Sequence, residues 1–211
     1  MTTSDGGRAA RLPKEQRRKQ VLAAALEVFS NVGYHAASMD DIADRAGVSK
    51  PVLYQHFPGK LDLYLALLDA GIDELLAASN AALAGTHDNH VRVSAMTNAY
   101  FRFIDDPAGA FRLVFESDLA NEPAVRERVD AVDLAVARKI ADVIAEDTGL
   151  SNEQALLLAS GLQGMTQVAA RRWLRDGSPA IDRAEAVELI SGLGWRGISG
   201  FPLSHPPADA E

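Results

Sequence analysis

The sequence contains no cysteine and no long uncharged apolar run, and each absence excludes a class of protein. Without cysteine there is no disulfide scaffold, cysteine zinc site, thiol catalysis or cysteine-ligated iron–sulfur cluster. The longest stretch without a charge, from Gln154 to Ala170, is too short and too polar to cross a bilayer. The first residues lack an apolar signal core, so we expect a cytoplasmic protein with no membrane partner.

The charge is acidic overall but unevenly distributed along the chain. The 211 residues carry 21 basic and 29 acidic side chains, which gives a net charge of −8. Residues 1–60 hold nine basic and six acidic groups and so carry +3, which leaves −11 for the rest. A basic front on an acidic body favours a polyanionic partner for the front alone, although a solvated basic helix gives the same count.

The spacing of apolar residues predicts an all-α protein of about nine helices, because no segment shows sustained strand alternation. Ser38, Ser49, Ser151 and Asp182 stand where helices begin, and Gly47 stands where one ends. The expected helices cover residues 13–32, 38–46, 49–57, 60–84, 90–105, 107–119, 122–147, 151–176 and 182–197.

Residues 38–57, with the sequence SMDDIADRAGVSKPVLYQHF, predict two short helices joined by a tight turn at Gly47. This pattern is typical of a helix-turn-helix, in which the second helix enters the major groove of DNA. A helical pair used only for packing is the alternative. The short polar first turn of the second helix favours DNA, and the candidate contacts are Ser38, Ser49, Lys50, Pro51, Val52, Tyr54, His56 and Lys60.

The candidate contacts have specific chemical roles. Lys50 offers its charge to a phosphate or to the edge of a guanine, and Tyr54 and His56 offer ring donors to the DNA backbone. Lys60 opens the next helix, where its charge and the free amides both favour a phosphate.

The stretch from Gln20 to Leu65 has a GY after the first helix, a second helix ending in AGVS, then LYQHF and a lysine opening the fourth helix. It resembles the DNA-binding domain of the TetR family of bacterial regulators. The resemblance implies an all-helical homodimer on a palindromic double-stranded DNA operator. It also implies a C-terminal body that binds a small molecule, with the last two helices forming the dimer. Pro51 stands where glycine or alanine is common in the family, so one backbone donor is missing here.

A narrower resemblance lies in the motifs RLPKEQRR, VSKPVLYQHF and FRLVFESDLANEPAV and in the helix ending ARRWL. They are similar to actinobacterial regulators of fatty-acid synthesis, which respond to long-chain acyl-CoA. We therefore expect a tail at 1–10, a DNA-binding domain at 11–59, a helical body at 60–200 and a frayed end at 201–211. We expect the protein in the bacterial cytoplasm, associated with the nucleoid.

The body contains an aromatic cluster and a helix with two apolar faces. The cluster is either plain core or the wall of an apolar ligand tunnel. The resemblance favours the tunnel, with candidate residues Phe101, Phe111, Phe115, Leu162, Met165 and Trp173. Each helical glycine costs about 1 kcal/mol against alanine, which a close helical neighbour would explain. The candidate dimer contacts are therefore Leu157, Gly161, Gly164, Val168, Val187, Ile190 and Gly194.

No pattern of catalytic or metal-binding residues stands out. His87, Asp88 and His90 lie in a polar loop without a fourth ligand, and the carboxylate pairs come without a nucleophile or a phosphate loop. We therefore expect no enzyme, no metal and no cofactor. Two functions remain open: a ligand-responsive DNA-binding regulator, or a DNA-binding or interaction module with a plain helical core and no effector.

Overall fold

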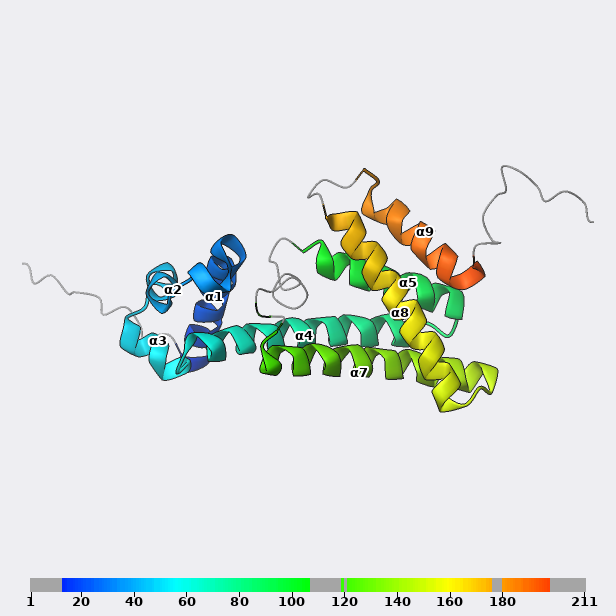
Figure 1. The fold of residues 1–211 in the computed structure, drawn as a ribbon, viewed down its shortest axis with the longest axis horizontal. Helices are drawn as coiled ribbons and strands as arrows, with labels where there is room; N and C mark the ends of the chain where they lie inside the picture. Colours follow the sequence, from blue (N-terminus) through cyan, green and yellow to red (C-terminus); the bar gives the residue numbers. More distant parts are fainter. Residues whose placement is uncertain (1–12, 107–118, 120, 176–179, 198–211) are drawn as a thin grey trace, which may run out of the picture. The chain divides into compact units, whose positions relative to one another are not determined.

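The structure, a computed structural model, describes residues 13–106, 119, 121–175 and 180–197. Within these residues the regular elements are all helices (Figure 1). They are α1 (Lys14–Ala36), α2 (Met39–Ala46), α3 (Lys50–His56), α4 (Lys60–Ala84), α5 (Asn89–Ile104), α7 (Pro123–Thr148), α8 (Asn152–Leu174) and α9 (Arg183–Arg196).

The predicted all-α class is confirmed, and eight of the predicted helices appear within a few residues of their expected bounds. The predicted helix at 107–119 lies outside the described residues except for its last position. The expected tails at 1–10 and 201–211 lie outside them as well. None of the described helices is long and apolar enough to span a membrane.

The chain divides into two compact units between Leu67 and Leu68, inside α4. The sequence placed the boundary before Lys60, at the Pro58–Gly59 break. The difference arises because the first turns of α4 are buried in the first unit. Tyr64 is 1% exposed, and its ring lies edge-on to Phe29, with ring centroids 5.5 Å apart.

The first unit packs α1, α2 and α3 around small and branched apolar side chains. Val21 and Ala25 of α1, Ile42 of α2 and Leu53 of α3 are all completely buried. Gly33 interrupts α1 with a φ of 78°, a backbone conformation that residues with side chains rarely adopt. The predicted end of the first helix is therefore a break, after which the helix resumes as far as Ala36.

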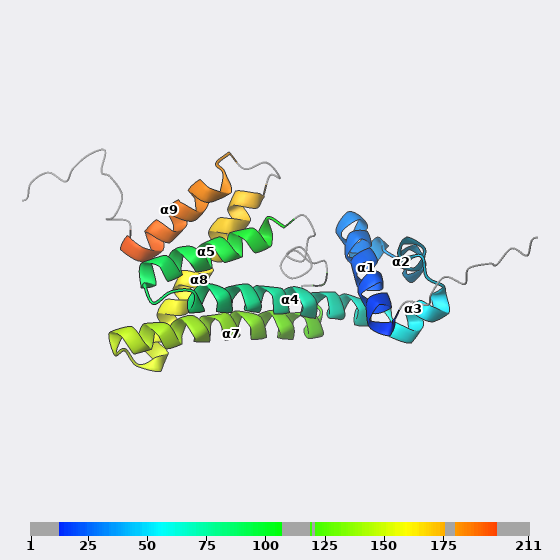
Figure 2. The same ribbon diagram turned by 180° about the vertical axis from the view of Figure 1, so that it is seen from behind.

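The second unit is a bundle formed by the rest of α4 with α5, α7, α8 and α9. Helix α8 packs against α7, α5 and α9, and α5 also packs against α9. Helices α4 and α7 lie side by side in both views (Figures 1 and 2). Arg128 Nε of α7 donates to Asp69 Oδ1 of α4 at 2.7 Å, which joins these two helices. This bundle surrounds the cavity described below.

Candidate nucleic-acid interface and ligand pocket

The turn between α2 and α3 is fixed by hydrogen bonds at both ends of α2. At its start, Ser38 Oγ accepts from the amide of Asp41 at 3.1 Å and donates to the Asp41 carboxylate at 2.6 Å. At its end, Gly47 has a φ of 61°, and its amide donates to the carbonyl of Asp44 at 3.1 Å. Ser38 was predicted both to cap α2 and to contact DNA. The structure confirms the cap and commits its hydroxyl to Asp41.

Helix α3 presents a polar face while Leu53 anchors its opposite face in the core. Ser49, Lys50, Pro51 and Tyr54 are exposed. Tyr54, 47% exposed, is one of the large hydrophobic side chains on the protein surface. Two further candidates, at positions 52 and 56, are partly buried. The first turn of α3 therefore offers short side chains, one cation and one phenol to a partner.

Ser49 was predicted to cap α3, and the structure confirms its position but not the capping hydrogen bond. It occupies the position before the helix, but its side chain makes no capping hydrogen bond. A capping side chain bonds the amide of the second or third helical residue, and the second residue here is Pro51, which has no N–H. The Ser49 hydroxyl is therefore not committed to a cap and remains exposed on the candidate DNA surface.

Lys50 pairs with an acidic side chain of the preceding helix. Its Nζ lies 2.6 Å from Asp40 Oδ2, and both side chains are more than half exposed. The hydrogen bond to Asp40, followed by the attraction of the two charges, raises the pKa of Lys50 above its usual value. Lys50 is therefore firmly cationic. Because solvent screens the pair, a phosphate can compete with Asp40 for it.

Lys60 has hydrogen-bond partners within the first unit, and its predicted phosphate contact stays a prediction. Its Nζ donates to the carbonyls of Tyr34 and Ala37, each at 2.8 Å, and lies 4.4 Å from the centroid of the Tyr34 ring. The break at Gly33 leaves carbonyls at the end of α1 without amide partners, and the Lys60 ammonium group donates to them instead. Lys60 thus fastens the start of α4 to the end of α1.

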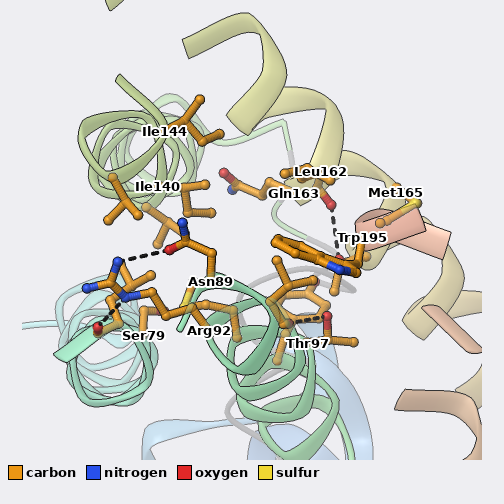
Figure 3. A pocket seen from close by; sticks show the side chains of 18 of the residues that line it. Ser79, Asn89, Arg92, Thr97, Ile140, Ile144, Leu162, Gln163, Met165 and Trp195 are labelled. Atoms are coloured by element: carbon orange, nitrogen blue, oxygen red, sulfur yellow. Dashed lines mark hydrogen bonds between the residues drawn. The ribbon is translucent and has the colours of Figure 1, made fainter. Parts of the chain in front are cut away.

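The second unit contains a partly open cavity of about 480 Å³ lined by α4, α5, α7, α8 and α9 (Figure 3). Its wall is mostly apolar. It includes Ile140 and Ile144 from α7, Leu162 and Met165 from α8, and Trp195 from α9. A volume of this size with a mainly apolar wall is typical of sites for small ligands.

One part of the cavity wall is polar. Arg92 Nη1 donates to Asn89 Oδ1 at 3.0 Å, and its Nε donates to the carbonyl of Thr86 at 2.8 Å. The Asn89 amide in turn donates to Asp147. These bonds hold the guanidinium group of Arg92 against the loop between α4 and α5.

Deeper in the bundle, Asp133 of α7 accepts hydrogen bonds from two glutamine side chains of α8. Gln163 Nε2 lies 2.9 Å and Gln167 Nε2 lies 2.8 Å from Asp133 Oδ1. Burial raises the pKa of Asp133, while the two hydrogen bonds and the charge of Arg171 act in the opposite direction. Burial likewise raises the pKa of Tyr100, which lines the cavity, so its phenol remains protonated.

The predicted ligand residues divide into three groups. Leu162 and Met165 line the cavity, as expected. Phe101 and Trp173 do not, because their rings pack on each other with centroids 5.4 Å apart. The Trp173 Nε1 also donates to the carbonyl of Ile181. Phe101 is buried core and Trp173 is partly buried, and neither lies in the wall of this cavity. Their predicted role as ligand contacts stays a prediction. The remaining two candidates, Phe111 and Phe115, lie outside the described residues.

The sequence also missed much of the cavity wall. Leu75 and Leu83 of α4, and Met96 of α5, line it together with the α7 residues named above. The apolar stripe of α7 was visible in the sequence, but a stripe does not reveal whether it faces a filled core or a cavity. No local signal in the sequence separates these wall residues from core.

The four predicted dimer contacts on α8 form a stripe along the helix, and three of them are exposed. Leu157 is 75% exposed and Val168 is 62% exposed. Added Cβ atoms at Gly161 and Gly164 would meet nothing within 4 Å among the described residues. The stripe therefore combines exposed apolar side chains with positions where another helix can approach closely.

The predicted dimer contacts on α9 do not share this arrangement. Val187 is 7% exposed and is packed within the chain, and Ile190 is partly buried. A Cβ on Gly194 would lie 3.2 Å from Cε of Met165. Val187 therefore packs inside the unit, and Gly194, which is partly buried, allows α9 to approach α8. Their predicted place in the dimer interface stays a prediction.

Comparison with known proteins identifies the family of this chain. Residues 21–67 match the family described as bacterial regulatory proteins, tetR family. The chain is 46% identical over 197 residues to the HTH-type transcriptional activator FasR of Mycolicibacterium smegmatis, a match that covers 93% of this chain and 90% of that protein. The chain belongs to the TetR family of bacterial regulators. It is a DNA-binding transcriptional regulator and not an enzyme, as the sequence predicted.

Solved structures agree with this TetR-family assignment. A TetR-like transcriptional regulator from Rhodococcus sp. RHA1 is 27% identical, with a TM-score of 0.69 and coverage of 90% of this chain and 100% of that one. The transcriptional regulator FadR from Bacillus subtilis, solved in complex with stearoyl-CoA, has a TM-score of 0.71 at 18% identity. That match covers 85% of this chain and 98% of FadR. At 18% identity, the likeness to FadR shows a shared fold alone.

Proposed function

We propose that this regulator acts as a homodimer on a palindromic operator and responds to a long apolar ligand such as a long-chain acyl-CoA. The observation that carries the proposal is the cavity of about 480 Å³ in the second unit. Leu75, Ser79 and Leu83 of α4 form part of its wall. The same helix begins at Lys60, which is fastened to α1 in the DNA-binding unit. One helix therefore belongs to both units.

The chemistry of the cavity supports an acyl chain as the ligand class. Its wall is mainly aliphatic, and each buried CH₂ group contributes about 0.8 kcal/mol. The relative FadR was solved with stearoyl-CoA, and FasR is named a transcriptional activator. We infer that longer chains bind more tightly until the cavity is full.

The exposed stripe of α8 supports a dimer. Leu157 and Val168 would be covered by a second copy, and Gly161 would let the two helices approach closely. A two-fold pair presents two recognition helices to successive major grooves, about 34–36 Å apart, and therefore favours a palindromic site. Such a regulator works in the cytoplasm, at the nucleoid.

Ligand binding would act on DNA through α4. A ligand shifts operator affinity only by its preference for one shape of the cavity over another. A coupling of about 1–3 kcal/mol would change operator affinity roughly 5–150-fold. A small displacement of α4 at Leu75 or Leu83 would reach its Lys60 end and alter the position of the DNA-binding unit.

The test begins with genome-wide mapping of the DNA that the protein binds. A duplex with a mapped sequence is then used to measure the affinity of the full chain by fluorescence anisotropy. Lys50→Ala should weaken binding and reduce the slope of affinity against salt by about one unit. Tyr54→Ala should weaken binding as well. Arg138→Ala removes one exposed positive charge from α7 and serves as the control. Equal affinities for all three variants and the wild type would refute the assignment of the α3 face.

A further inference from the structure

The polar side chains that line the cavity differ in how their hydrogen bonds are satisfied. The hydroxyl groups of Ser79, Thr97 and Thr166 each donate to the carbonyl four residues earlier in their own helix, at 2.8, 2.9 and 3.0 Å. A hydroxyl used in this way does not offer its proton to a ligand. These three residues therefore add little to the recognition of a ligand's polar groups.

Gln163 is different. Its Nε2 donates to Asp133 Oδ1, and Gln167 donates to the same oxygen from one turn further along α8. A carboxylate only accepts, so the amide of Gln163 must turn its NH₂ group toward Asp133 and its carbonyl oxygen away. That oxygen, Oε1, is buried and has no hydrogen-bond partner in the described part of the chain.

The Gln163 side chain that carries this oxygen lies in the cavity wall. Gln163 lines the cavity, and its amide extends from α8 into the space that faces Ile140 and Ile144 of α7 (Figure 3). Buried side-chain acceptors nearly always have a donor, so an exception on a cavity wall points to a donor on the ligand. The apolar surroundings strengthen such a bond because no bulk water competes for it.

We infer that Gln163 Oε1 is a subsite that accepts a hydrogen bond from a hydroxyl group on an otherwise apolar ligand. The adjacent Asp133 carboxylate disfavours a ligand carboxylate at this point, so the subsite selects a neutral donor. The cavity would then distinguish a hydroxylated aliphatic chain from a plain chain of equal length. This inference rests on the proposed ligand-binding function and specifies which polar group of the ligand the same cavity recognises.

The test compares two probes with equal numbers of non-hydrogen atoms, 1-decanol and 1-methoxynonane, by calorimetric titration of the full chain. Only the alcohol carries a donor. A hydrogen bond of ordinary strength predicts that 1-decanol binds about 2–10-fold more tightly than the ether. Decanoate, which is anionic at neutral pH, should bind more weakly than the alcohol.

Two variants locate the preference. Gln163→Met keeps the length of the side chain and removes the acceptor, so the two neutral probes should bind equally. Thr166→Val, on the same helix, removes a hydroxyl already bonded to its own helix, so the preference for the alcohol should remain. Gln163→Leu provides a second acceptor-free variant if the methionine form does not fold.

The outcomes separate the two levels of the proposal. Equal binding of the alcohol and the ether to the wild type would overturn the subsite while leaving the cavity as a ligand site. A preference that persists in both Gln163 variants would overturn it too. If neither neutral probe binds the wild type at all, the subsite is overturned, and the ligand-binding function itself fails only if acyl-CoA does not bind either.

Discussion

The two units of this regulator place their functional residues in opposite ways. The first unit has a filled core, with Leu53 and Ile42 completely buried, and presents its candidate DNA contacts on the outside of α3. The second unit holds its candidate site inside, as a cavity of about 480 Å³. A surface for DNA needs a rigid base, whereas a ligand site needs space that packing has left open. Substitutions should therefore affect the two units differently.

The largest expected effect comes from truncating the base of the DNA-binding helix. Leu53→Ala should destabilise the first unit by roughly 2–5 kcal/mol, because it opens a void in a filled core. The matched change Leu162→Ala enlarges an existing cavity in the second unit and should cost less. Thermal unfolding and operator binding of both variants measure the contrast. Equal losses of stability, with operator binding intact in Leu53→Ala, would contradict it.

The next largest effect concerns assembly. Leu157→Glu places a charge on the exposed stripe of α8 and should convert the dimer to a monomer at micromolar concentration, with loss of operator affinity. Leu134→Glu is the control, because Leu134 is 40% exposed and lies on a different helix, α7. Light scattering measures the masses. A wild type that is already monomeric would refute the dimer proposal.

Substitutions at two glycines should have smaller effects on stability, and these effects should have opposite signs. Gly47→Ala forces a side chain into a φ of 61° and should cost roughly 1–2 kcal/mol in the first unit. Gly161→Ala lies within α8 with open space around it, so it should stabilise an isolated chain by about 1 kcal/mol. Chemical unfolding of both variants provides the test. Stabilisation by Gly47→Ala would show that the turn is not constrained as described.

The smallest effect concerns pH. Because burial raises the pKa of Asp133, the folded chain keeps a proton that the unfolded chain has lost. The free energy of unfolding should therefore fall as pH rises from the ordinary value of 3.8 toward the raised pKa. Asp133→Asn should remove this dependence and change Tm by no more than about 2–4 °C. Identical pH profiles of the two proteins would exclude Asp133 as the source.

The sequence predicted most of the first unit because its signals are local. Ser38 with Asp41 and the turn at Gly47 are short-range patterns that determine where α2 begins and ends. The partners of Lys60 within the chain could not be predicted, because the carbonyls near Tyr34 are far from it in the sequence. A lysine at a helix start looks the same whether it meets a phosphate or a broken helix.

The second unit was predicted as helices but not as a site. Whether an aromatic residue fills core or lines a cavity depends on the arrangement of five helices, and no local pattern encodes that arrangement. Of the predicted ligand residues, Leu162 and Met165 lie in the cavity wall, whereas Phe101 and Trp173 pack on each other. The faces of α9 could not be distinguished for the same reason, and Gly194 turned inward.

The most direct test of the central claim, that the interior of one unit controls the surface of the other, is a titration of acyl-CoA chain lengths against a labelled operator duplex. The wild type should show an affinity change that grows with chain length, within roughly 5–150-fold. Ile140→Trp fills the cavity and should abolish the response while leaving ligand-free DNA binding unchanged. Leu134→Trp, on the exposed side of α7, should respond as the wild type does. The claim is contradicted if no chain length changes operator affinity, or if Ile140→Trp still responds fully.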